Sequence, residues 1–410
     1  MRISQIEPLI LNVSAKTNWF FIRITADNAL QGIGEASLNG YEPLQQAFLA
    51  NVSRELIGQP VEDVERLTRV HSSAPYGLVG ASVLSAIEQA LCDLLAQHAG
   101  VPLHAWLSDT DAVAGSATAG SSNTESSTAG SATAPPRIPV YANINRATVE
   151  RSPAGCAASA RRALEQGFRG VKIAPFDGVI SDEFPTHRSE QRKRIDAGLA
   201  RVFAIRDAIG PDARLMIDCH WRFDEGTAMT VLGELEPVRL HWFECPVTEQ
   251  PAGWEALARL RNAANKRGVL LAGAEMQIGV GGFAPLLERG LFDVIMPDVK
   301  FAGGYREMQR IAALAKRHGV AASPHNPTGP VCNFASMHLM LASDDFSVLE
   351  FQLGESALFF DIVGGKRPQL ADGHFAAPPA VPGLGLKLDD SVLAAHPYQR
   401  VAPGLDPRLG

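Results

Sequence analysis

Apolar and polar residues alternate over residues 3–13 and again over residues 19–25. Alternation with a period of two is typical of half-buried β-strands, so the two runs predict a strand pair around a turn. The Gly-Ile-Gly stretch at residues 32–34 breaks this pattern just before Glu35. We expect a small sheet in this part of the chain.

In residues 44–99, apolar residues recur every three or four positions, which is the spacing typical of a helix. Gly100 and Pro102 follow as helix stop signals. Together with the sheet, this pattern predicts an α+β domain over residues 1–108. Residues 109–137 are almost wholly Ser, Ala, Thr and Gly, which bury too little apolar surface to offset the entropy of ordering. We predict a flexible insertion there.

From residue 138 onward, short β-rich runs alternate with stretches of helical pattern, and each stretch tends to end in Gly. The eight runs cover residues 139–144, 170–173, 214–217, 240–243, 270–274, 294–296, 320–322 and 347–349, and the helical stretches include residues 156–166, 198–209, 254–267 and 305–318. Eight repeats of strand and helix predict an α/β fold, a (β/α)8 barrel over residues 138–362. An open doubly wound sheet is the alternative, but no G-x-G-x-x-G follows the first run.

The composition agrees with a folded protein of two domains. A length of 410 residues exceeds what one hydrophobic core usually serves, and the chain is 46% hydrophobic and 20% charged. A net charge of −7 provides no basic surface for nucleic acid or anionic membranes. Five cysteines without C-x-x-C spacing predict reduced thiols that bind no metal. Without a signal-peptide pattern or 18 consecutive apolar residues, the chain is expected to be soluble and cytoplasmic.

Ionisable residues end seven of the eight predicted strands. They are Lys172, Asp218, Glu244, Glu275, Asp298, His325 and Glu350. In a barrel, the carboxyl ends of the strands form the active-site face. Buried charges are costly unless they are paired or bind a metal, so a set of this size predicts a functional site.

Asp218, Glu244 and Glu275 end the third, fourth and fifth strands, which are neighbours. Three carboxylates without Cys or His suit a hard cation, Mg²⁺ before Zn²⁺. For any one of them, the alternative is capping of the next helix or pairing with Lys or Arg. Cys219 and Cys245 directly follow two of the carboxylates, so they point to the opposite strand face and are predicted to be core residues.

Asp298 and His325 end the sixth and seventh strands, where the carboxylate can fix the imidazole tautomer of a general base. A structural histidine is the alternative. His220 lies two residues beyond Asp218 on the same face, which suits an acid that protonates a leaving group, or else a solvent-exposed rim histidine. Lys172 provides a positive charge across the site or a salt bridge to a metal-binding carboxylate.

With these residues in place, the chain resembles the enolase superfamily, specifically its mandelate racemase subgroup, from Gly32-Ile33-Gly34-Glu35-Ala36 to about Glu355. The resemblance implies an N-terminal capping domain that residues 363–410 complete, and a homo-oligomer. It also implies Mg²⁺ on the three carboxylates, a His325–Asp298 dyad as base, and Glu350 hydrogen-bonded to the oxygen of the enolate.

The reaction that the resemblance implies depends on two departures from mandelate racemase. That enzyme uses a Lys-x-Lys pair whose second lysine is a base, whereas this chain has Lys172-Ile173-Ala174. Asp218-Cys219-His220 is similar instead to the Asp-x-His element of galactonate dehydratases, whose His is an acid for the departing hydroxyl. The resemblance therefore implies an acid sugar dehydratase. His325 removes the proton α to the carboxylate, and the ene-diolate loses the 3-hydroxyl to give a 2-keto-3-deoxy acid.

The loops of the first domain and the loop after the first barrel strand are expected to bind the sugar acid substrate. The candidates are Asn18, Trp19, Asn39, Tyr41, Asn143, Asn145 and Arg146. Arg146 either holds a distal carboxylate or pairs with a surface acid. Two other functions stay open. One is a racemase or epimerase with Lys172 or His220 as second acid, and the other is a non-catalytic metal-binding scaffold that interacts through residues 109–137.

Overall fold

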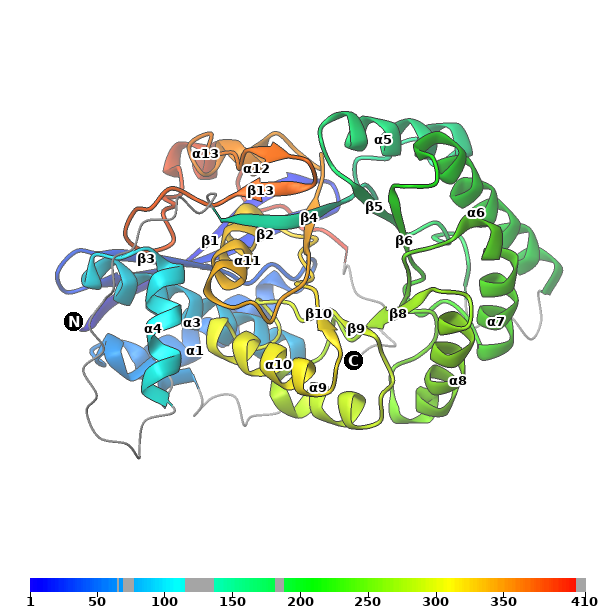
Figure 1. Cartoon of the computed structure of the whole chain (residues 1–410). Helices are drawn as coiled ribbons and strands as arrows, with labels where there is room; N and C mark the ends of the chain where they lie inside the picture. Colours follow the sequence, from blue (N-terminus) through cyan, green and yellow to red (C-terminus); the bar gives the residue numbers. More distant parts are fainter. Residues whose placement is uncertain (65, 69–76, 115–135, 181–187, 403–410) are drawn as a thin grey trace, which may run out of the picture.

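The computed structural model describes residues 1–64, 66–68, 77–114, 136–180 and 188–402 (Figure 1). Its N-terminal part holds an antiparallel sheet in the order β1 (Ile3–Ser14), β2 (Thr17–Ala26) and β3 (Gln31–Glu35). The predicted strand pair is confirmed as β1 and β2.

Strand β3 corrects the expectation that Gly-Ile-Gly at residues 32–34 breaks the strand pattern. Helix α3 (Gly77–Ala99) lies directly against this strand. A Cβ atom on Gly32 would stand 2.0 Å from the carbonyl oxygen of Ala90, and one on Gly34 would stand 2.0 Å from that of Ala86. The face that touches the helix therefore carries no side chains, which removes the alternation that identifies a strand in the sequence.

The helical region is confirmed as α1 (Glu42–Leu56) and α3, with a short 3-10 helix, η1 (Val61–Asp63), between them. Helix α3 is long and apolar enough to cross a membrane, but 78% of its most apolar window is buried, so it is a core helix. Helix α4 (Leu103–Ala114) runs into the stretch predicted as an insertion. Residues 115–135 of that stretch lie outside the described residues.

The described residues from 137 onward contain eight parallel strands with helices between them. The strands are β4 (Arg137–Asn143), β5 (Gly170–Ile173), β6 (Arg214–Asp218), β7 (Trp242–Glu244), β8 (Leu270–Gly273), β9 (Val294–Ile295), β10 (Ala321–Ala322) and β11 (Leu349–Gln352). The helices are α5 (Pro153–Glu165), α6 (Arg188–Ile209), α7 (Glu225–Glu234), α8 (Trp254–Asn265), α9 (Gly279–Glu288), α10 (Tyr305–Arg317) and α11 (Pro330–Ala342), with 3-10 turns η3 (Glu236–Val238) and η4 (Pro251–Gly253). The eight predicted runs are confirmed, with ends that differ by a few residues.

Hydrogen-bonded neighbours follow chain order from β4 to β10, and β11 pairs with β4. Between β10 and β11 the pairing is reduced to a parallel bridge of Ala322 with Phe346 and a bond from the Ser347 amide to the Ala322 carbonyl oxygen (2.8 Å). The arrangement is the (β/α)8 barrel predicted from the sequence.

A cluster of apolar side chains inside the barrel shows which side of each strand faces inward. It consists of Tyr141, Met216, Trp242, Ala272, Val294, Met296 and Val348. Because side chains alternate along a strand, residues two positions further along face the interior too, closer to the carboxyl ends. These are the positions from which an active site is built in a barrel.

The C-terminal segment lies beside the N-terminal sheet in Figure 1 (orange to red). After α12 (Leu358–Asp361), strand β13 (His374–Ala376) pairs with β12 (Leu370–Ala371) and with the start of β4. Helix α13 (Asp390–Ala395) then packs on β1, and its Asp390 pairs with Arg23 at 2.9 Å.

Two buried carboxylates of the N-terminal domain cap helices of the barrel. Glu35 accepts hydrogen bonds from the amides of Gly329 (2.8 Å) and Cys332 (3.0 Å) at the start of α11. Glu88 accepts one from the amide of Tyr305 (2.8 Å) at the start of α10. Helix N-termini favour negative charge, so these contacts hold the N-terminal domain against the helices that follow the sixth and seventh strands.

We expect Glu88→Gln to stabilise the protein at alkaline pH only. Burial raises the pKa of Glu88 from 4.5 to about 7, against the opposing effect of its bonds to α10. The folded protein thus binds this proton more tightly than the unfolded chain, and stability falls as the pH rises from 4.5 through 7. In urea unfolding, the free energy of unfolding of the variant should exceed that of the wild type by about 3 kcal/mol at pH ~8.5 and by little at pH ~5.

The matched control is Glu255→Gln, because Glu255 is exposed on α8. It should change the unfolding free energy little at either pH. A Glu88→Gln protein that is less stable than the wild type at pH ~8.5 would show that the charged bonds to α10 outweigh the cost of burial.

Candidate active site

The seven predicted strand-end residues lie together at the carboxyl end of the barrel. None of them is more than 7% exposed. Ion pairs and short contacts connect Lys172, Glu244, Glu350, His325, Glu275 and Asp298, and Asp218 lies beside Glu244 and Glu275. Burying so many charged groups together destabilises a fold, so such a cluster is typical of a functional site.

Asp218, Glu244 and Glu275 form the carboxylate triad of this site. One oxygen from each lies within 4.8 Å of the others, and all three side chains are buried. Trp242, two residues before Glu244 on β7, donates its Nε1–H to Glu244 Oε2 at 2.8 Å. The triad thus has the spacing and the oxygen donors of a metal site.

Glu275 reaches the triad only because the backbone turns before it. Ala272 faces the barrel interior, so regular alternation would direct Glu275 outward, toward the helices. Ala274 adopts a left-handed conformation (φ 70°), which reverses that direction. The Ala274 amide donates to Glu249 Oε1 at 3.0 Å, so the buried Glu249 stabilises the turn.

The electrostatics of the triad fit a bound cation. Burial, together with the charges of Asp218 and Glu244, raises the pKa of Glu275 well above its ordinary value. Burial also raises the pKa of Glu244 to about 8, although Lys172 opposes this. Glu275 Oε2 has no hydrogen-bond partner among the described residues. An orphaned buried oxygen beside two more carboxylates is the donor set that a divalent ion would satisfy.

His325 and Asp298 form the predicted dyad. His325 Nδ1 lies 2.8 Å from Asp298 Oδ2, and His325 Nε2 lies 3.3 Å from Glu275 Oε2, on the side of the triad. Lys300 Nζ contacts the same Asp298 oxygen, and Lys300 is itself buried. Burial alone would raise the pKa of Asp298, but the charges of Lys300 and His325 lower it. Asp298 is therefore an ionised acceptor that directs His325 Nε2 toward the triad.

Lys172 joins the triad to Glu350. Its Nζ lies 2.6 Å from Glu244 Oε1 and 2.9 Å from Glu350 Oε1, so the salt bridge to a triad carboxylate is formed. Asn143 Nδ2 and the Asn326 amide donate to Glu350 as well, at 2.7 and 3.0 Å. Although burial opposes it, the charge of Lys172 lowers the pKa of Glu350. Glu350 is therefore a carboxylate that accepts hydrogen bonds.

His220 stands beside the triad on the side of Asp218. Its Nε2 lies 2.6 Å from Asp218 Oδ2, and its side chain is 37% exposed. His220 and Trp221 both adopt left-handed backbone conformations (φ 46° and 55°), which are uncommon for residues other than glycine and typical of functional sites. Contact with His220 lowers the pKa of Asp218 to about 2, although burial acts in the opposite direction.

The substrate-binding candidates from the N-terminal domain differ in how far they are buried. Trp19 is completely buried and packs edge-on against Phe359 with ring centroids 5.7 Å apart, so the prediction that it contacts substrate is wrong. It fails because Trp19 lies within β2, a strand with core on both faces. Asn18 is also buried, and its amide donates to Asn39 Oδ1 at 3.1 Å. Asn39 and Tyr41 are half-buried in the segment before α1.

The three candidates at the end of β4 and in the segment after it lie near the mouth of the barrel. Asn143 is occupied by its bond to Glu350, and Asn145 is half-buried and accepts from Arg151 at 2.9 Å. Arg146 is ion-paired with Glu355, whose side chain is only 6% exposed. The structure shows the alternative in which Arg146 pairs with an acid, although the side chain of that acid is largely covered and not at the surface.

Sequence reasoning missed three residues that shape the site, Lys300, Trp242 and Glu249. Trp242 lies two positions before Glu244 on β7, so strand alternation could have placed it on the same face. Lys300 lies in a turn after β9, where this alternation does not apply. No sequence signal marks Glu249, because its contact with Ala274 joins the segments after two different strands. The two cysteines predicted to be core, Cys219 and Cys245, are buried, and all five cysteines are free.

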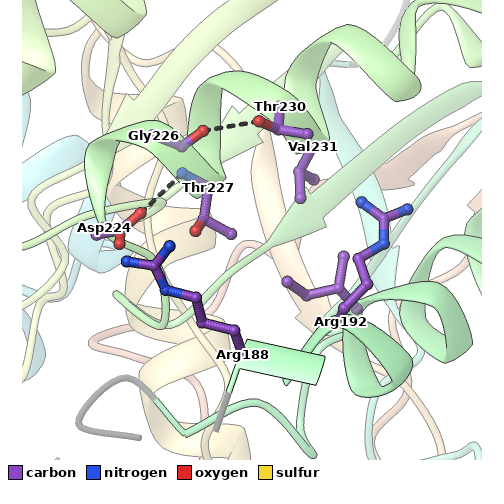
Figure 2. A pocket seen from close by; sticks show the side chains of 8 residues that line it. Arg188, Arg192, Asp224, Gly226, Thr227, Thr230 and Val231 are labelled. Carbon is purple, nitrogen blue, oxygen red and sulfur yellow. Dashed lines mark hydrogen bonds between the residues drawn. The ribbon is translucent and has the colours of Figure 1, made fainter. Parts of the chain in front are cut away.

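A separate pocket of about 430 Å³ lies between α6 and α7, outside the barrel (Figure 2). Arg188, Arg192, Asp224 and Thr227 are among its lining residues. Asp224 caps α7 by accepting from the Thr227 amide at 2.7 Å, and Arg192 pairs with Glu234 at 2.8 Å. None of the predicted site residues lines this pocket, so it is distinct from the carboxylate triad.

Comparisons with known proteins match both parts of the chain. The mandelate racemase/muconate lactonizing enzyme N-terminal domain matches residues 5–107, and the enolase C-terminal domain-like family matches residues 155–392. The chain is 28% identical to a D-galactonate dehydratase of Ralstonia pickettii over 92% of this chain and 90% of that protein. It is 27% identical to a D-xylonate dehydratase of Haloferax volcanii over 92% and 85% of the two chains.

Solved structures show the same fold. A mandelate racemase/muconate lactonizing enzyme from Jannaschia sp. CCS1 matches with a TM-score of 0.79 and 25% identity over 97% of this chain and 98% of that one. A putative galactarate dehydratase from Agrobacterium radiobacter, solved with Na and L-malate bound, matches with a TM-score of 0.79 and 24% identity over 100% and 98%.

Proposed function

The chain belongs to the mandelate racemase/muconate lactonizing enzyme family of the enolase superfamily, and on this premise we propose that it is a Mg²⁺-dependent acid sugar dehydratase. The observation that carries the proposal is a base and an acid on two sides of one carboxylate triad. His325 Nε2 lies 3.3 Å from Glu275, and His220 Nε2 lies 2.6 Å from Asp218. Elimination of water needs one group to take a proton and another to give one.

Asp218, Glu244 and Glu275 would hold the ion. When bound, Mg²⁺ supplies positive charge that stabilises the negative charge developing on the substrate carboxylate. The buried and orphaned oxygen of Glu275 supports this assignment.

His325 acts as the base. Asp298 accepts the Nδ1–H, so the lone pair of Nε2 is free to take the proton on the carbon α to the carboxylate. Lys172 provides the fixed positive charge for the enolate that results. The resemblance assigns a hydrogen bond to the enolate oxygen to Glu350. We propose that Lys172, which Glu350 and Glu244 hold in place, donates a hydrogen bond to the same oxygen.

His220 then donates a proton to the departing 3-hydroxyl, and the enol that forms tautomerises to a 2-keto-3-deoxy acid. Ala174 stands where a second lysine base would be needed for two-base racemisation. Its methyl group takes no proton, which favours elimination over exchange of configuration.

We expect His220→Asn to lower keto acid formation by about 100-fold or more while exchange of the α-proton with solvent continues. The reason is that His220 acts after His325 has removed the proton. Exchange is followed by NMR in D2O, and keto acid is followed as its semicarbazone. Equal loss of both signals would show instead that His220 acts by positioning Asp218, whose Oδ2 lies 2.6 Å from His220 Nε2.

The function itself is tested by offering purified protein and Mg²⁺ a panel of sugar acids that includes D-galactonate, D-xylonate, D-mannonate and galactarate. A semicarbazone from one or a few acids, abolished by EDTA, supports the dehydratase. Proton exchange without keto acid overturns it in favour of a racemase or epimerase that uses Lys172 or His220 as second acid. Neither exchange nor keto acid from any member of the panel rejects acid sugar dehydration for these substrates.

A further inference from the structure

Gln352, the last residue of β11, carries a buried carboxamide that has no hydrogen-bond partner in the described part of the chain. Its side chain is 97% buried, since the residue is 3% exposed. Neither Oε1 nor Nε2 makes a hydrogen bond to any residue that the structure describes. Buried side-chain amides in proteins are almost always hydrogen-bonded, so a carboxamide with both ends unpaired indicates a missing partner.

The side chain of Gln352 faces the barrel interior. Val348 belongs to the apolar cluster inside the barrel, and Glu350 contacts Lys172 there. Gln352 continues this series at every second position. Phe351, between them, packs outward against Phe168 with ring centroids 5.9 Å apart.

Gln352 also lies at the mouth. It pairs in register with Asn143, the last residue of β4, whose side chain bonds to Glu350. Two residues of strand place Gln352 about 6–7 Å beyond Glu350 toward the carboxyl end. A ligand whose reacting end sits at Lys172 and the triad would extend past Gln352.

We propose that Gln352 determines substrate specificity by binding a hydroxyl group of the acid, an inference that rests on the proposed dehydratase function. A carboxamide offers one donor group and one acceptor, which match the acceptor and donor of a hydroxyl. It carries no charge, so it does not select a second carboxylate. Gln352 lies beyond Glu350, which places the hydroxyl it binds on the part of the substrate that does not react.

The test is Gln352→Met, which keeps the length of the side chain and removes both polar atoms. We expect kcat/KM for the substrate to fall by about tenfold to 100-fold and the melting temperature without substrate to rise, because an unpaired polar group leaves the interior. If Gln352 had only a structural role, the substitution would lower both kcat/KM and the melting temperature. On an analogue of the same acid that lacks the bound hydroxyl, wild type and variant should have equal kcat/KM.

Ser336→Ala is the matched control. Ser336 is buried on α11, and its Oγ also lacks a partner among the described residues, but it is not part of the site. Removing the Ser336 hydroxyl should leave kcat/KM unchanged. Unchanged kcat/KM in Gln352→Met, or an equal loss on every deoxy analogue, overturns the assignment while leaving the dehydratase intact.

Binding without turnover separates this inference from the proposed function. Thermal shifts with Mg²⁺ and D-galactonate, D-xylonate, D-mannonate or galactarate report binding whether or not a keto acid forms. A shift that Gln352→Met weakens, without any keto acid from wild type, supports Gln352 as a hydroxyl-binding residue and overturns the dehydratase. No shift of the wild type with any of these acids overturns both.

Discussion

Replacing His325 with Asn is expected to lower kcat for keto acid formation by about 10³- to 10⁴-fold. Asn can still reach Asp298, which lies 2.8 Å from His325 Nδ1, but it offers no basic nitrogen at the position of Nε2. Since the histidine acts on a proton and not on binding, the loss should appear in kcat, with KM little changed. Exchange of the α-proton in D2O should be lost together with keto acid.

His318→Asn is the control for this variant, because it makes the same chemical change at an exposed position at the end of α10. It should leave both signals at the wild-type level. Exchange at the wild-type rate in His325→Asn would show that a group other than His325 takes the proton.

Replacing Glu275 with Gln is expected to have opposite effects with and without metal. Burial and the charges of Asp218 and Glu244 raise the pKa of Glu275, so the metal-free folded protein binds its proton more tightly than the unfolded chain. Stability without metal therefore falls as the pH rises above the ordinary glutamate value of 4.5. At pH ~8 in EDTA the variant, which carries no charge there, should melt at a higher temperature than the wild type.

With Mg²⁺ the order should reverse. A ligand at 100 times its Kd stabilises the folded state by about 2.7 kcal/mol, and only the protein with all three carboxylates should gain this. Differential scanning calorimetry with EDTA and with a Mg²⁺ titration measures both effects. Glu288→Gln, at an exposed position on α9, controls for the loss of one negative charge. A Glu275→Gln protein that keeps the wild-type Mg²⁺ shift would contradict the assignment of the triad.

The barrel could be predicted because each strand and helix has its own local signal. Eight short β-rich runs alternate with helical stretches that tend to end in Gly, and few folds accommodate that repeat. The site followed from the same pattern, since the carboxyl ends of the strands of a barrel meet at one face. Lys172, Asp218, Asp298 and His325 all lie on the inward side that strand alternation assigns to them.

The errors arise where a contact with another segment overrides the local pattern. The glycines of β3 look like a break, but they let α3 approach the strand. Trp19 looks like a loop residue near the site, but core covers both faces of its strand. The sequence left open whether Arg146 binds a substrate or pairs with an acid, because its partner Glu355 lies 209 residues away along the chain.

The sequence by itself determined which strand ends carry the ionisable groups and how they are ordered around the barrel, because that order is the chain order of parallel neighbours. Only the tertiary structure decided that Glu275 faces inward, since this depends on the left-handed turn at Ala274 that Glu249 holds. It also decided that Lys300 shares Asp298 with His325 and that Gln352 has no hydrogen-bond partner among the residues that the structure describes. A side chain's charge can be read from the chain, whereas its partners depend on the packing of segments that are distant in sequence.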